Sequence, residues 1–126
     1  MRFFIKLHMP ESTWIEKEII RDVVQWKKDM RSAGHYVFGN PLKPPGMTSS
    51  IVRNEAGDLE VVEAPVEEKS IIFYAFEILE CESMEEAVEL AKRHPALKFD
   101  QASMEVREIW DSLDLDVLGQ EHPDHS

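Results

Sequence analysis

The chain has 126 residues, the length of one globular domain, and a domain of this size buries roughly two thirds of the surface of its unfolded chain. Its formal net charge of −11 argues against nucleic-acid binding, because phosphate contacts depend on clustered Lys and Arg. No apolar run approaches the ~20 residues of a transmembrane helix, and Lys6 and His8 interrupt the N-terminal run too early for a signal peptide. One cysteine excludes an internal disulfide framework. These features predict a cytoplasmic protein that binds neither nucleic acid nor membrane.

Residues 2–9 are predicted to form the first strand, because apolar residues alternate there with a mixed set. A helix is predicted from Thr13, which forms a capping box with Glu16, to a stop at Gly34. Steps of three and four give this helix one buried face, made of Ile15, Ile19, Val23, Trp26, Met30 and Ala33. Its basic residues lie largely off that face: Lys17, Arg21, Lys27, Lys28 and Arg31.

The rest of the chain predicts a hairpin and then a second strand–helix–strand unit. A short extended piece at residues 35–38 leads into a Pro-rich loop, and residues 48–53 and 59–63 form a hairpin around the turn at 54–58. Residues 71–80 have the composition of a strand, and Ser83 and Glu86 form a capping box for a helix that Pro95 ends. Residues 103–110 are the last predicted strand. Residues 1–110 therefore form the domain, and residues 111–126 an acidic, largely flexible tail.

This order of elements predicts an α+β fold, a ferredoxin-like split βαβ plan with an added β-hairpin. Two helices would cover one face of an antiparallel sheet. The other face would be mixed, with Phe4, Lys6 and His8 from the first strand and Glu105, Arg107 and Ile109 from the last. A face with several apolar groups seldom stays fully solvated, so we expect it to pack on a second copy as a two-fold homodimer.

Five stretches carry a resemblance to a known family: Gly34 after the first helix, the strand at 48–53, and the segments VVEAPVEEK (61–69), EEAVELAKRHP (85–95) and MEVR (104–107). From about Arg2 to Trp110 the chain resembles the YCII-related family, in particular its DGPF-domain branch. The resemblance implies a homodimeric α+β barrel made from two ferredoxin-like halves, in a bacterial protein.

The chain departs from the family pattern at two places. The branch is named for an Asp-Gly-Pro-Phe tetrapeptide after its hairpin, where this chain has Glu63, Ala64, Pro65 and Val66. Ala does not readily take the positive φ that Gly allows, so the turn, and the ligand that fits it, are expected to differ. The YCII branch proper is suspected to use a His on the first helix with a downstream Asp. Residues 10–32 hold no His, so this pair is not carried over.

A set of polar residues is predicted to meet in a cleft between hairpin and sheet: Lys6, His8, Arg53, Glu63, Lys69, Glu105 and Arg107. Such a cleft would hold a small anionic or carboxylate-bearing molecule, because an Arg fork can make two hydrogen bonds to a carboxylate. The alternative is that Glu105 and Arg107 form cross-strand or intersubunit ion pairs that hold the dimer in register. His8 is a candidate general base, or else a hydrogen-bonded interior histidine.

The other titratable groups are given structural roles. His94 lies at a predicted helix end, where its cation would meet the negative end of the helix dipole. Cys81 has an acidic residue on either side, which raises a thiol pKa, so it is expected to be structural. The spacing of His122, Asp124 and His125 resembles no closed zinc site, and no metal or cofactor is expected.

Two functions remain open. Dimeric barrels of this type resemble isomerases, dehalogenating lyases and monooxygenases that use little or no cofactor, which implies a small-molecule-binding protein or a cofactor-independent enzyme. DGPF-type proteins also resemble parts of bacterial regulatory systems associated with alternative sigma factors, which implies a non-catalytic regulatory or protein-interaction module. A ligand cleft would favour the first function, and co-purification with a protein partner the second.

Overall fold

The computed structural model describes residues 1–13 and 15–111, so the predicted tail lies almost entirely outside the described residues. The elements in chain order are β1 (Arg2–Pro10), α1 (Lys17–Ser32), β2 (Tyr36–Pro41), the 3-10 turn η1 (Pro45–Met47), β3 (Ser50–Arg53), β4 (Leu59–Val62), β5 (Ile71–Glu80), α2 (Met84–Ala91), the 3-10 turn η2 (Pro95–Lys98) and β6 (Ser103–Glu108). No helix within this part of the chain is long and apolar enough to cross a bilayer.

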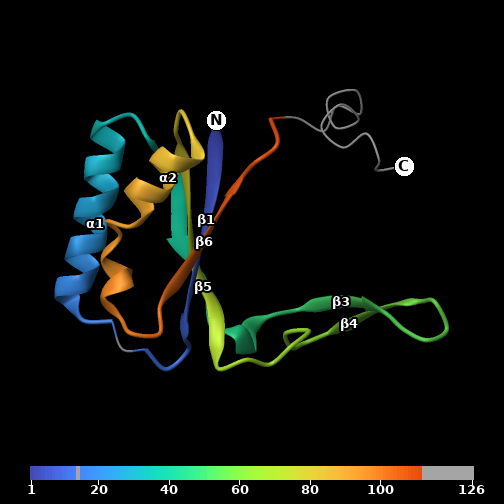
Figure 1. The fold of residues 1–126 in the computed structure, drawn as a ribbon. Coiled ribbons are helices and arrows are strands. Elements are labelled where there is room, and N and C mark those ends of the chain that lie inside the picture. Colours follow the sequence, from blue (N-terminus) through green and yellow to red (C-terminus); the bar gives the residue numbers. More distant parts are fainter. Residues whose placement is uncertain (14, 112–126) are drawn as a thin grey trace.

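The main sheet has the strand order β2-β5-β1-β6, and each neighbouring pair is antiparallel. Both α-helices of the described residues lie on one side of it, as Figure 1 shows. Strands β3 and β4 pair separately as the hairpin that is inserted between β2 and β5. The predicted α+β fold with a ferredoxin-like arrangement and an added hairpin is therefore confirmed.

Strand β1 sits in the centre of the sheet and separates its two faces. Its buried residues point toward the helices, and all are at most 4% exposed: Phe3, Ile5, Leu7 and Met9. The alternate residues Phe4, Lys6 and His8 face the other way and are partly exposed. A register shift between Leu7 and His8 marks a bulge against β5.

Helix α1 begins later than its sequence predicts. The predicted capping box at Thr13 and Glu16 is wrong: Glu16 is itself the N-cap, and its side chain makes no capping hydrogen bond. The Thr13 amide instead bonds the Pro10 carbonyl in a turn. The predicted stop is confirmed, because Gly34 takes a φ of +82° and lets the His35 amide reach the Met30 carbonyl.

Helix α2 begins at the predicted cap, since the Ser83 hydroxyl accepts a hydrogen bond from the Glu86 amide at 3.1 Å. A hydrogen bond connects the two helices, because Trp26 Nε1 donates to the Leu90 carbonyl at 3.1 Å.

The prediction that His94 is a cation at the negative end of the helix dipole is wrong. It is 5% exposed, its ring centre lies 4.8 Å from that of Trp26, and burial lowers its pKa to about 4, so it carries no cation near neutral pH.

The face away from the helices, called the open face here, is rich in phenylalanine. Phe4 stacks on Phe76 with ring centres 5.8 Å apart, and Phe73 meets Phe4 edge-on at 6.1 Å. Phe38 of β2 lies 5.7 Å from Phe76 and is 53% exposed. The hairpin β3–β4 projects from the same side of the sheet, opposite the helices (Figure 1).

Candidate functional site

A cleft of about 980 Å³ lies where the open face meets the loop after β2 and the segment that leads into β5. Its walls carry four basic residues, Lys6, His8, Lys43 and Lys69, and three acidic ones, Glu11, Glu67 and Glu68. Apolar groups complete the lining, among them Leu42, Val66, Ile72 and Phe73. The cleft therefore combines charge with apolar surface, which is typical of small-molecule sites.

Two of the cleft lysines lack a carboxylate partner within the described residues. Lys6 Nζ lies 4.8 Å from the centre of the Phe73 ring, in a cation–π contact. Neither Lys6 nor Lys43 forms an ion pair with a described residue. Lys69 differs, because its Nζ lies 3.1 Å from Glu67 Oε2. Lys6 and Lys43 are therefore unpaired cations of the cleft, and Glu11 and Glu68 of its lining likewise form no ion pair with a described residue.

His8 is the histidine of the cleft, and histidine is the side chain that most often serves as a general acid or base. Its Nε2 lies 3.5 Å from Glu105 Oε1, and within the described residues it makes no hydrogen bond. The Phe73 ring lies 6.3 Å from the imidazole on the same face. His8 and Glu105 are thus neighbours across β1 and β6, as the predicted strand faces require.

The other predicted site residues lie elsewhere. Arg53 donates to the Gly57 carbonyl in the hairpin turn, and Glu63 accepts a hydrogen bond from Ser49 at 2.7 Å. Arg107 is exposed on β6, opposite Phe4. Only Lys6, His8 and Lys69 of the predicted set line the cleft. Of the four residues that replace the Asp-Gly-Pro-Phe tetrapeptide, Pro65 and Val66 line it as well.

A buried polar group on the helix side of the sheet was not predicted. Glu77 of β5 is 4% exposed, and its Oε1 lies 3.4 Å from the Nζ of Lys27, a residue that was predicted to lie off the buried face of its helix. Burial raises the pKa of Glu77, and Lys27 opposes the shift. Tyr36 lies beside them, and burial together with Glu77 raises the pKa of its hydroxyl. The Tyr36 hydroxyl and Lys27 both donate to the Gly39 carbonyl.

Gly39 is required next to this buried carboxylate. A Cβ at position 39 would overlap the Phe76 carbonyl and lie 2.7 Å from Glu77 Oε2. Sequence alone indicated neither contact, because Glu77 sits within an otherwise apolar strand run and only the β2–β5 register brings Gly39 against it.

Outside the cleft, His35, Cys81 and Glu86 hold donor atoms that lie within 4.8 Å of one another. Cys81 is 4% exposed, and burial, followed by Glu86, raises its thiol pKa to about 11. The direction of this shift is the one expected from the sequence, although its largest cause is burial and not a flanking carboxylate.

Comparison with known proteins agrees with this architecture. A search of the curated proteins found no match. The model of the YCII-related domain matches residues 1–112, which is most of the chain. By this match the protein belongs to the YCII-related domain family.

Proposed function

We propose that this YCII-related protein is a homodimer that binds a small carboxylate-bearing molecule in the cleft beside Lys6. One observation carries the proposal: in a chain with a net charge of −11, two lysines without carboxylate partners among the described residues point into one cleft. A lysine without a carboxylate partner can pair with the carboxylate of a ligand, and the unpaired Glu11 and Glu68 of the same cleft favour a ligand with few charges.

The cleft chemistry favours an anion with an apolar body. Lys6 is held against the Phe73 ring, so a carboxylate bound to its Nζ would lie beside an aromatic surface. Leu42 and Ile72 extend that surface along the walls. A purely inorganic anion would satisfy the lysines but leave the apolar walls in water, so the proposal favours an organic acid.

The open face supports the dimer. Four phenylalanines and Ile78 share it, and a contiguous apolar patch on a monomer marks a contact surface. A stable interface buries about 800 Å² on each partner. The hairpin projects from this side of the sheet, so it could add area by reaching over a second copy (Figure 1). Pairing on the open face would also exclude water from the neighbourhood of His8.

His8 is the proposed proton-transfer group of the cleft, should the ligand be a substrate. Its Nε2 is free of hydrogen bonds within the described residues, and Glu105 at 3.5 Å would stabilise the imidazolium that forms on accepting a proton. Such chemistry needs neither metal nor cofactor.

The test measures thermal unfolding in the presence of phosphate, succinate and phenylacetate. Phenylacetate is expected to raise Tm more than phosphate does, and the Lys6→Met variant to lose that rise. Lys92→Met is the matched control, because Lys92 is the C-cap residue of α2, is not among the residues that line the cleft, and pairs with Glu89. Equal Tm shifts in wild type and Lys6→Met, or none with any organic acid, would argue against the cleft.

A regulatory role is the second candidate, and the hairpin favours it. Ile51, Leu59 and Val61 share one face of β3–β4 by register and are each at least 64% exposed. This apolar hairpin face could be covered by a different protein, where the dimer proposal would cover it with a second copy of the chain. Co-purification of a partner that an Ile51→Glu change abolishes, with no ligand-dependent Tm shift, would support this role over ligand binding.

A further inference from the structure

Three separate segments meet at the end of the sheet where β2 begins and β5 ends. Gly34, with its positive φ, turns the chain after α1 and places His35 at the start of β2. Cys81 follows the last residue of β5, and its amide bonds the Met1 carbonyl at 2.8 Å. The Ser83 cap places Glu86 in the first turn of α2. Each position is therefore fixed by its own local structure.

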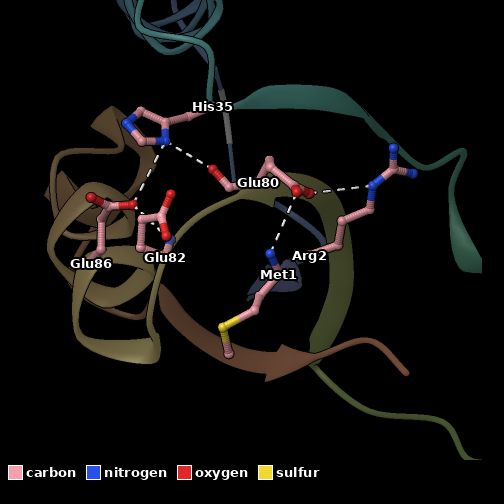
Figure 2. A network of polar contacts seen from close by, with 6 residues as sticks. All are labelled: Met1, Arg2, His35, Glu80, Glu82 and Glu86. Carbon is pink, nitrogen blue, oxygen red and sulfur yellow. Dashed lines mark hydrogen bonds and ion pairs between the residues drawn. The ribbon is translucent and has the colours of Figure 1, made fainter. Parts of the chain in front are cut away.

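Figure 2 shows how the charges around this point are arranged. The Glu80 carboxylate forms ion pairs with the Met1 amine and with Arg2 Nε, each at 3.4 Å, and turns away from His35. Glu86 instead faces the imidazole, with its Oε1 3.9 Å from His35 Nδ1. The Glu82 amide donates to the same oxygen at 3.0 Å and orients the carboxylate. Glu86 is thus the carboxylate that His35 and Cys81 share.

We propose that His35, Cys81 and Glu86 bind a thiophilic divalent cation of the Zn²⁺ type. One imidazole, one thiol and one carboxylate oxygen lie within 4.8 Å of one another. In a tetrahedral site with bonds of about 2.0–2.3 Å, the donors stand roughly 3.3–3.7 Å apart. Closing the cluster therefore needs movements of about 1 Å, which the 37% exposed side chain of Glu86 can supply. Three protein donors leave a fourth position for water.

Binding changes the protonation of two ligands. The Cys81 S–H bond breaks as the metal–sulfur bond forms, and the proton goes to solvent. The neutral His35 ring moves its proton from Nδ1, where the Glu80 carbonyl accepts it at 2.8 Å, to Nε2 by exchange with solvent and without net release; Nε2 points away from the Glu80 carbonyl in Figure 2. One proton is released in total, so binding weakens as the pH falls from about 8 to about 6.

The sequence did not predict this site, because its donors come from three elements and follow no metal-binding spacing. The burial of Cys81 alone suggests an inert thiol. The cluster is evident only once the pairing of β2 with β5 and the start of α2 are known.

The test is a Co²⁺ titration of the full-length protein in a non-thiol reductant, followed by absorption. Wild type is expected to develop a sulfur-to-cobalt charge-transfer band that saturates at one equivalent and disappears on adding Zn²⁺. The chain has one cysteine, so the band reports Cys81 and no histidine elsewhere can produce it. Cys81→Ser should abolish the band.

Two further variants separate a built site from a lone thiol. His35→Gln and Glu86→Gln should each raise the Co²⁺ midpoint by roughly 100-fold or more, while Glu82→Gln, in the same network, should leave it unchanged. Absence of a band in folded wild-type protein would overturn the proposal. An unchanged midpoint in His35→Gln and Glu86→Gln would overturn it equally, and both variants remain informative if Cys81→Ser does not fold.

Discussion

Replacing Lys27 with Met removes the cation that lies 3.4 Å from the buried Glu77 carboxylate. The Gly39 carbonyl keeps a donor, because the Tyr36 hydroxyl also bonds it at 3.2 Å. The main effect of the change is thus a carboxylate, 5% exposed at its side chain, that has lost its counter-ion.

Breaking a buried ion pair by removing one partner costs about 3–5 kcal/mol. Lys27 is 19% exposed at its side chain, so water tempers the effect, and the lower end of that range applies. A loss of about 3 kcal/mol is a large share of a typical domain's stability and lowers Tm by roughly 10 °C at this chain length.

The loss should depend on pH. Burial raises the pKa of Glu77 above its ordinary value of 4.5, and Lys27 opposes the shift, so removing Lys27 raises the pKa further. A raised carboxyl pKa means that the folded state binds more protons than the unfolded state. Stability then falls as the pH rises from 4.5 through the folded-state pKa. Lys27→Met should therefore be less destabilising at low pH than at neutral pH.

Urea unfolding of four proteins at two pH values tests this reasoning: wild type, Lys27→Met, Lys28→Met, and Lys27→Met combined with Glu77→Met. Lys28 is the matched control, because it is exposed on the same helix. The double variant should recover most of the unfolding free energy that Lys27→Met loses, since an apolar pair can replace a buried ion pair. Equal losses for the two single lysine variants, or a loss independent of pH, would refute the account of Glu77.

Three further changes test other parts of the fold by urea unfolding. Gly39→Ala should destabilise by about 1–3 kcal/mol, because its Cβ would overlap the Phe76 carbonyl; wild-type stability would contradict this. Ser83→Ala should cost about 1 kcal/mol by removing the α2 cap, and no loss would argue against that cap. The His94 pKa falls from 6.5 to about 4 on folding, so the unfolded state binds the proton first and stability drops as the pH falls through that interval. His94→Asn keeps an acceptor for the Ala96 amide and should remove that drop in stability. If the stability of this variant fell with pH as steeply as that of wild type, the role given to His94 would be contradicted.

Local patterns predicted most of the fold. Alternation identified β1, and residues 71–80 match β5 from end to end. Gly34 and the Ser83 cap marked a helix end and a helix start. The start of α1 was mispredicted because Thr13 is held by a turn to Pro10, a competing local bond that leaves the capping pattern unused.

The candidate site was less predictable, because the pairing register of the strands decides which of its residues come together. Strand alternation placed Lys6, His8 and Glu105 on one face correctly, since β1 and β6 pair without a bulge. The contribution of β5 was missed, because a register shift interrupts its alternation and an apolar run does not reveal which side each Phe takes. Lys43 was missed because no periodicity exists in the loop that carries it.

Sedimentation at micromolar concentration tests the proposed pairing of open faces most directly. The account predicts a particle of about twice the 14.6 kDa chain mass for wild type. Phe38→Glu should sediment as single chains, because it places a charge in the phenylalanine patch. Ile20→Glu, a change at a similarly exposed apolar residue on α1, should remain a dimer. Single chains of wild type, or a dimer that Phe38→Glu leaves intact, would contradict the account.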